Sequence, residues 1–384
     1  MKNVLLYYNF SYPLGGGDIL PLTFASWLQS RCDLTLAVDS EAGFRRAVEA
    51  FGIPLDMERI KVAPLLPDGL GPRLHTAFWS YRRSTRLKRL AAKADLCLSA
   101  ANVTDFGRPA HHFINMLSGV DHAFTAQSGI VRPKASIKRF LVDEVIRPLV
   151  GMRSKRRIFA DGRERFYSNS RYVHDRLTAF YGDFHDTIFY PPTTYEPEDS
   201  GEAPPRDPLR VICLGRISPQ KRILDIIDVV ERARALSGKD IRLTVAGPCG
   251  SGEYATKVRQ IVAARPWITL VDGVFGRVKD DLLRSGGFAV HARRDEEFGI
   301  AVTEYLKAGL IPVVPDAGGS SEVVAARELT YATNDDAARI LAHLVTDDGF
   351  RAAMQRHCAQ RATDFSRDAY LARQHDLLQR ILAQ

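Results

Sequence analysis

Short apolar runs alternate with amphipathic stretches along the first half of the chain. The runs at 4–8 and 34–38 flank a stretch with apolar residues at helical spacing, 20–30. Apolar runs of about four to eight residues are typical of strands buried in a parallel sheet, and the helix between them is the crossover that joins them. We expect further strands at 96–99, 123–127 and 166–168, and a helix from about Arg171.

The same alternation restarts after a proline-rich and acidic stretch without periodicity, 190–208. Such a stretch is typical of a linker. The pattern therefore predicts an N-terminal domain at 1–192, a linker at 193–208, a C-terminal domain at 209–365, and a helix at 366–384 that packs across both domains. In the second domain we expect strands at 209–214, 241–246, 268–271, 288–291 and 311–314, and helices at 223–236, 254–264 and 300–308.

Two α/β domains of similar size, each built on a parallel sheet, predict a cleft between them. Ligands of open parallel sheets bind beyond the carboxyl ends of the strands. We therefore expect both carboxyl edges to face that cleft and candidate functional residues to follow strands.

The segment at 296–322 is the strongest candidate for chemistry. Glu296 and Glu304 are eight positions apart, which corresponds to roughly 10 Å along a helix. This is too far for one shared proton, but it suits two contacts on an extended ligand. The amides of Phe298, Gly299 and Ile300 would begin the helix and present its positive dipole end to a diphosphate.

A second glycine-rich turn follows in the same segment. Gly309 is placed to end the helix in the left-handed conformation, and an Ala-Gly-Gly turn occupies 317–319. We expect Ser320 or Ser321 to cap another helix, which carries Glu322.

Basic residues follow the first strand of the second domain. Arg216 and Lys221 come after Gly215 and before a helical pattern, where a guanidinium fork and an ammonium group could neutralise two phosphates. A solvated basic loop is the alternative interpretation. His291, at the end of a later strand, could contact a sugar hydroxyl or only satisfy its neighbours.

Glycine also occupies the first βα turn, at Gly15, Gly16 and Gly17. Without Cβ atoms, the amides of such a turn can approach a phosphate closely. Many βα turns use glycine for the turn alone, so these residues carry little weight without the other motifs.

Together these motifs resemble those of the retaining glycosyltransferases of family GT4, which have the GT-B fold. The spacing from Glu296 to Glu304 resembles the family's E-x7-E signature, LGRISPQK its GR-x4-K element, and PLGGGD its N-terminal glycine loop. NSRYV and YPP resemble smaller landmarks. The resemblance implies a metal-independent hexosyltransferase that uses a nucleoside-diphosphate sugar and acts in polysaccharide or glycoconjugate assembly.

The resemblance also implies roles for residues. Arg216 and Lys221 would stabilise the donor diphosphate, with the 15–17 loop and Gly215 beside the same phosphates. Glu304 would bind the ribose hydroxyls and Glu296 the hydroxyls of the donor sugar. The departing diphosphate would accept the proton of the acceptor hydroxyl, so neither glutamate acts as a glycosidase-type nucleophile, for which their separation is also too large.

A narrower likeness points to the donor. HARRDEEFGI from His291, AGLIPV and the triple glycine resemble the eukaryotic mannosyltransferases that extend a dolichol-linked oligosaccharide from GDP-mannose. This favours a GDP-sugar, with a UDP-sugar as the alternative. Those enzymes have a histidine near the reacting sugar, where this chain places Asn115. His111 and His112 lie a few positions earlier.

Charge is concentrated in the first half of the chain. The net charge is +8, and residues 70–166 hold 19 Lys or Arg against 7 Asp or Glu. Such a surface favours an anionic partner. The segments 73–93 and 132–166 could contact an anionic membrane peripherally, and a solvated helix is the alternative interpretation for 73–93. No nucleic-acid reader motif occurs, so no nucleic-acid partner is expected.

The five scattered cysteines include no C-x-x-C pair, so we expect neither disulfides nor a metal site. The N-terminus reads as a first strand, not a signal peptide. We therefore expect a cytoplasmic protein, peripheral on the inner face of the membrane if 73–93 makes that contact. Two other functions stay open: a sugar-nucleotide epimerase on the same fold and, more distantly, a basic nucleic-acid-binding protein.

Overall fold

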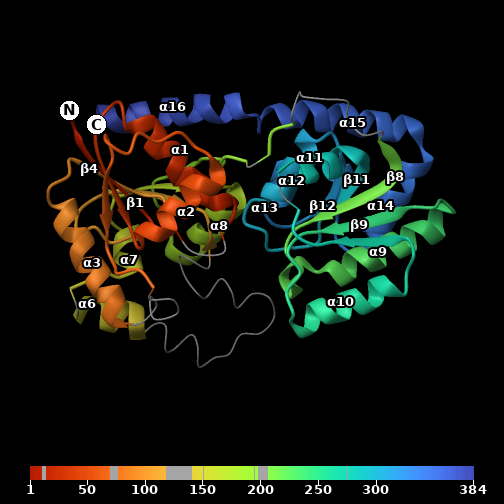
Figure 1. Ribbon diagram of the computed structural model, residues 1–384, viewed down its shortest axis with the longest axis horizontal. Coiled ribbons are helices and arrows are strands. Elements are labelled where there is room, and N and C mark those ends of the chain that lie inside the picture. The colour runs from red at the N-terminus through yellow and green to blue at the C-terminus, as the bar shows by residue number, and fades with distance from the viewer. Residues whose placement is uncertain are drawn as a thin grey trace. The chain divides into compact units, whose positions relative to one another are not determined.

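The chain divides into two compact units. The computed structural model describes residues 1–10, 14–69, 77–117, 141–149, 151–193, 195–197, 206–274 and 276–384. Unit 1 comprises Met1–Pro192 and Leu371–Gln384, and unit 2 comprises Thr193–Tyr370 (Figure 1).

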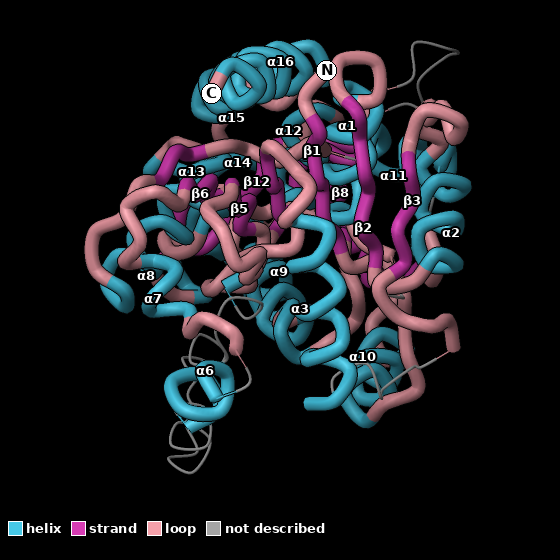
Figure 2. The backbone as a smooth tube through the Cα atoms, turned by 90° about the vertical axis from the view of Figure 1, so that its left-hand side faces the viewer, coloured by secondary structure: helices cyan, strands magenta, loops and turns pink. Residues whose placement is uncertain are grey.

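Unit 1 is built on a seven-stranded parallel sheet in the order β3-β2-β1-β4-β5-β6-β7. Four successive residues of β1 are buried, as expected for a strand covered on both faces. Figure 2 shows β1, β2 and β3 side by side. The strands are β1 (Asn3–Tyr8), β2 (Asp33–Val38), β3 (Lys61–Pro64), β4 (Leu96–Ser99), β5 (His111–Ile114), β6 (Arg165–Ser168) and β7 (Asp186–Ile188).

Helices of unit 1 start and stop at residues suited to those positions. Ser40 caps α2 by accepting a hydrogen bond from the amide of Gly43, and Gly52 ends that helix with a φ of 60°. The longer helices are α1 (Ile19–Leu28), α2 (Glu41–Phe51), α3 (Ala77–Ala91) and α8 (Arg171–Tyr181), and the short ones are α6 (Arg147–Leu149) and α7 (Lys155–Phe159).

The final helix, α16 (Arg367–Ala383), begins in unit 2, and its residues from Leu371 onward belong to unit 1. There it packs on α1. Trp27 Nε1 donates to His375 Nδ1 at 3.2 Å, and the side-chain amide of Gln374 donates to the carbonyl of Thr23 at 3.1 Å.

Unit 2 is built on a six-stranded parallel sheet in the order β10-β9-β8-β11-β12-β13. The first and fourth strands in sequence, β8 and β11, are neighbours, so the residues that follow them meet at one edge. The strands are β8 (Asp207–Leu214), β9 (Arg242–Ala246), β10 (Ile268–Val271), β11 (Gly286–Val290), β12 (Ile311–Pro315) and β13 (Thr330–Tyr331).

The helices of unit 2 cover this sheet. They are α9 (Ile223–Ser237), α10 (Glu253–Ala263), α11 (Gly276–Ser285), α12 (Ile300–Lys307), α13 (Gly319–Val324), α14 (Asn334–Thr346) and α15 (Asp348–Thr363). Gly309, after α12, has a φ of 77°, which confirms the predicted left-handed stop.

The predicted cap of α13 was wrong. Gly318, with a φ of 81°, occupies the N-cap, and no side chain caps the helix. Ser321 instead donates from its hydroxyl to the Gly318 carbonyl at 2.8 Å. The predicted strand at 123–127 lies outside the described residues. Among the described helices, none is long and apolar enough to cross a membrane.

Candidate functional site

The loop that follows β11 brings three of the predicted residues together in unit 2. The ammonium group of Lys221 donates to Glu296 Oε2 at 2.6 Å. His291 Nε2 lies 3.2 Å from the same oxygen, although the two are not aligned as a hydrogen bond. Since β8 and β11 are adjacent, the residues after one strand reach those after the other.

The electrostatics of this cluster follow from burial and from Lys221. Burial by itself raises the pKa of the Glu296 carboxyl, but Lys221, His291 and Arg293 together hold that pKa well below its usual value. Burial lowers the pKa of His291, and the Glu296 carboxylate opposes this effect. Near neutral pH the cluster therefore contains an anionic Glu296 and an uncharged His291 ring.

Glycines allow the backbone around Glu296 to pack tightly. The amide of Gly319 donates to the Glu296 carbonyl at 2.7 Å. A Cβ at Gly319 would lie 2.3 Å from the Glu297 carbonyl oxygen. Gly299 has a φ of 101° and precedes α12. The predicted glycine-rich turn at 317–319 thus serves the loop that carries Glu296.

The strand end that carries Lys221 is also built on glycine. Gly215 has a φ of 149°, and a Cβ there would lie 3.6 Å from Lys221 Cε. Gly247, from the neighbouring strand end, approaches so closely that a Cβ would lie 2.4 Å from the Gly215 carbonyl oxygen. Arg216 is exposed and makes no ion pair with any carboxylate in the part of the chain that the structure describes. It is thus available to a ligand.

The second glutamate of the predicted pair has a different partner. Glu304 lies inside α12 and is buried. Lys279 of α11 donates to its Oε1 at 2.6 Å. Ile300 begins α12 and Phe298 is buried just before it. The two glutamates are thus held by two different lysines, from different segments.

In unit 1, Gly15, Gly16 and Gly17 follow β1 as predicted. Gly16 and Gly17 begin a 3-10 turn that ends at Asp18, and the amide of Gly15 donates to Asp18 Oδ2 at 2.6 Å. A Cβ at Gly15 would meet nothing within 4 Å. Asp18 therefore fixes the shape of this loop, a role that the sequence analysis did not assign.

Asn115 lies at the carboxyl end of β5, within a network of asparagines. Its amide donates to Asn102 Oδ1 at 2.9 Å, and its side chain donates to the Ala100 carbonyl at 3.2 Å. Asn169, after β6, donates from Nδ2 to the Asn115 carbonyl at 2.9 Å. Three neighbouring strand ends are thus joined by carboxamide groups.

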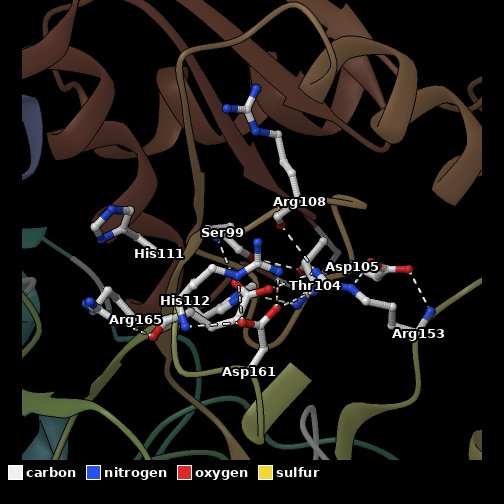
Figure 3. Close-up of polar contacts among 12 residues, drawn as sticks. Ser99, Thr104, Asp105, Arg108, His111, His112, Arg153, Asp161 and Arg165 are labelled. Atoms are coloured by element: carbon white, nitrogen blue, oxygen red, sulfur yellow. Dashed lines mark hydrogen bonds and ion pairs between the residues drawn. The ribbon is translucent and has the colours of Figure 1, made fainter. Parts of the chain in front are cut away.

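The two histidines before Asn115 lie within β5 and are buried. His112 Nε2 lies 3.0 Å from Glu164 Oε2, beside Arg153, which lies 2.8 Å from the other Glu164 oxygen. His111 Nδ1 instead lies 2.9 Å from the Tyr167 hydroxyl, and burial lowers the pKa of this histidine to about 4. Figure 3 shows the His111 ring pointing away from the polar cluster around His112. The ring of His112 is therefore held inside unit 1 by Glu164.

No group of three or more His, Cys, Asp or Glu side chains suited to a metal ion occurs among the described residues. The five cysteines are free thiols in the structure.

Comparison with known structures establishes the fold. Anabaena HepE in complex with UDP superposes with a TM-score of 0.68 and 15% identity, covering 100% of both chains. A sucrose-phosphate synthase from Thermosynechococcus elongatus superposes with a TM-score of 0.68 at 13% identity, again over 100% of both chains. WaaG, a glycosyltransferase of lipopolysaccharide biosynthesis, gives 0.67 at 13% identity over 97% of this chain and 98% of its own. The fold is GT-B.

Comparison of the amino-acid sequence gives one family match, which lies in unit 2, and one short match to a single protein. Residues 196–364 match the family of glycosyl transferases, group 1. A stretch of 50 residues is 48% identical to the GDP-Man:Man(3)GlcNAc(2)-PP-Dol alpha-1,2-mannosyltransferase of Yarrowia lipolytica. That match covers 13% of this chain and 8% of the yeast protein. The family match contains Arg216, Lys221, His291, Glu296 and Glu304.

Two further residues that contact the glutamates were given no role in the sequence analysis. Lys279 lies in α11 and Arg293 in the loop after β11, and nothing in the local sequence shows which carboxylate either cation would reach. Arg293 lies within the string HARRDEEFGI, which the sequence analysis used only for the narrower likeness and in which it gave this arginine no role.

Proposed function

We propose that this protein is a retaining hexosyltransferase. It moves a hexose from a nucleoside-diphosphate sugar to a hydroxyl of a glycan or lipid-linked acceptor in polysaccharide or glycoconjugate assembly. The observation that carries the proposal is the cluster of Lys221, His291 and Glu296, which lies within the segment that matches group 1 glycosyltransferases.

The proposed reaction breaks the bond between the anomeric carbon and the diphosphate oxygen and forms a bond from that carbon to the acceptor oxygen. The diphosphate takes up the acceptor's proton. Because the electron pair of the broken bond leaves with the diphosphate, negative charge develops there before the proton arrives, and Arg216 and Lys221 would stabilise it in place of a metal ion. Glu296 accepts hydrogen bonds from hydroxyls of the donor sugar.

The nucleotide half of the donor would bind near Glu304. A carboxylate fixed by Lys279 presents a defined acceptor to the two hydroxyls of a ribose. The amino end of α12, at Gly299 and Ile300, would offer its positive dipole end to the diphosphate.

A GDP-linked hexose, such as mannose, is the donor that we favour. Support comes from the 50-residue match to an enzyme whose name includes GDP-Man. A UDP-sugar is the alternative, since the HepE structures contain UDP and UDP-glucose.

A donor panel tests this proposal with water as the acceptor. We expect GDP-mannose to raise the melting temperature more than UDP-, ADP- and TDP-sugars, and slow hydrolysis to release mannose first as the α-anomer in proton NMR. A thermal shift with UDP-sugars alone would refute the GDP preference. Release of the β-anomer would contradict retention, and epimerised donor would favour the epimerase.

We also propose that unit 1 contacts an anionic membrane through α3. The helix carries five Lys or Arg and no Asp or Glu. Arg83 pairs with the buried Asp39 at 2.8 Å and Lys88 with Asp105 at 2.7 Å, which anchor its inner face. Phe78, Tyr81, Arg82, Arg86 and Arg89 form its exposed face. Exposed aromatics among cations are typical of a helix at a membrane surface.

The segment at 141–149 adds to this surface. Seven of the twelve large apolar side chains that are exposed among the described residues lie between positions 78 and 149. Lys88 of α3 donates to the carbonyl of Gly151, two positions after this segment, at 2.7 Å. The exposed apolar residues here are Leu141, Val145, Ile146 and Leu149.

Vesicle binding tests the membrane contact. The Phe78→Ser/Tyr81→Ser double variant should bind vesicles of phosphatidylcholine and phosphatidylglycerol about tenfold more weakly, since losing ~1.4 kcal/mol of apolar burial costs tenfold in affinity. The control is Leu236→Ser/Val278→Ser, which removes exposed apolar groups from unit 2. Two results would contradict this contact. One is that the wild-type protein binds vesicles of phosphatidylcholine alone as tightly as vesicles that also contain phosphatidylglycerol. The other is that both double variants lose the same amount of binding.

A further inference from the structure

Arg293 is surrounded by carboxylates in the loop between β11 and α12. Its NH1 lies 3.3 Å from Glu296 Oε1, its NH2 lies 2.9 Å from Glu297 Oε2, and its Nε lies 3.2 Å from Asp295 Oδ1. Each nitrogen of the guanidinium thus meets a different acid, and the side chain is about one-fifth exposed. The planar fork of arginine, unlike a lysine, can hold such an arrangement.

The two oxygens of Glu296 are held by different cations. Oε1 faces Arg293, whereas Oε2 faces Lys221 at 2.6 Å and His291 at 3.2 Å. A carboxylate held from both sides cannot rotate about its terminal torsion without losing one of these contacts. Arg293 is the described residue that holds Oε1 away from Lys221. Without it, both oxygens of Glu296 could accept hydrogen bonds from the Lys221 ammonium group.

We propose that Arg293 is a positioning residue, which holds Oε1 of Glu296 so that the carboxylate keeps one orientation toward the donor sugar and occupies Lys221 with one oxygen only. Lys221 has three N–H groups, and this arrangement leaves it able to serve the diphosphate. The part of the inference that concerns the donor rests on the proposed function. The part that concerns the orientation of Glu296 does not.

If Arg293 only stabilised the loop, its replacement should have the same effect as replacement of another residue that holds the loop. Arg293 also neutralises Glu297, whose pKa burial raises, so its loss could simply loosen the loop. Arg294 provides the comparison because it fixes the same loop elsewhere, lying 3.3 Å from Asp316 and donating to the Ala332 carbonyl. A structural effect should appear in both variants, whereas an effect on Glu296 should appear only in that of Arg293.

The experiment follows the ionisation of Glu296 by carboxyl carbon NMR, with the resonance assigned from Glu296→Gln. The charged or titratable groups near Glu296 are Lys221, His291 and Arg293, together with the Glu297 carboxyl and the Tyr305 hydroxyl. In Arg293→Gln we expect the titration midpoint of Glu296 to rise by about 1–2 pH units, since an opposite charge is lost. Arg293→Lys should restore part of this change, and Arg294→Gln should leave the midpoint unchanged.

Turnover of GDP-mannose forms the second arm. In Arg293→Gln we expect kcat to fall about tenfold or more with little change in KM, and the acid limb of the pH profile to move to higher pH. An unmoved Glu296 midpoint, or one moved equally in Arg294→Gln, would overturn the inference. If the midpoint moves as expected but the wild-type protein turns over no nucleotide sugar, the proposed function fails and the orienting role of Arg293 stands.

Discussion

Lys221→Ala is expected to lower the rate of hexose transfer by ~100- to 1,000-fold, the range found when one preorganised electrostatic donor is removed. The variant loses the ammonium group proposed to stabilise the departing diphosphate. It also removes the 2.6 Å contact with Glu296 Oε2, which leaves Arg293 as the cation that holds this carboxylate. Steady-state turnover of the nucleotide sugar, with free nucleoside diphosphate as the readout, measures the loss.

Folding of this variant should survive. Loss of one charged hydrogen bond costs roughly 1.5–3 kcal/mol, which is less than the ~5–15 kcal/mol typical of a stable domain. Lys239→Ala, which removes an exposed lysine from the same unit, is the matched control and should keep full activity. Near-normal turnover in Lys221→Ala, or an equal loss in Lys239→Ala, would contradict the role given to Lys221.

Gly319→Ala should destabilise unit 2 and disturb the site together. The added Cβ would lie 2.3 Å from the Glu297 carbonyl oxygen and 2.7 Å from Phe298 Cα, so backbone must move. Overpacking of this kind costs ~1–3 kcal/mol or more, and each ~1 kcal/mol lowers Tm by roughly 2–4 °C in a unit of this size. Because Gly319 also donates to the Glu296 carbonyl, turnover should fall with Tm.

Gly250→Ala is the control for this substitution. A Cβ at Gly250 would meet nothing within 4 Å, and its φ lies outside the left-handed region. At such a site alanine should leave Tm unchanged or raise it slightly, because it restricts the unfolded chain. Equal Tm values for the two variants, measured by calorimetry, would refute the tight packing assigned to Gly319.

Most of the strands could be predicted from the sequence because parallel strands covered on both faces are continuous apolar runs. The run at 96–99 corresponds to β4 residue for residue, and those at 209–214 and 311–314 differ from β8 and β12 only at their ends. The strands that were missed are short or polar. They are β3, β5, β7 and β13. β3 has four residues, none of them fully buried, and β5 begins with two histidines. β7 has three residues and β13 has two.

The candidate site was predicted in part. Turns that need glycine can be predicted from the local sequence, because a left-handed φ or a close approach of backbone requires glycine at that position. Gly215, Gly299 and Gly309 are examples. The predicted serine cap of α13 was wrong because the helix begins earlier, with Gly318 at its N-cap. Gly318 packs closely against the loop that carries Glu296, and a Cβ there would lie 2.9 Å from the Glu296 carbonyl oxygen.

By itself, then, the sequence determined the alternation of strands and helices, the glycine turns and the residue types placed after strands, because each of these depends on neighbours along the chain. Only the tertiary structure decided which side chains meet. Lys221 and Glu296 are 75 positions apart and pair because β8 and β11 are adjacent in the sheet. Lys279 of α11 reaches Glu304 of α12 for the same reason: contacts between segments depend on strand order and helix packing, which local patterns do not specify. Arg293 is only three positions from Glu296, and there the path of the loop decides which carboxylate oxygen it meets.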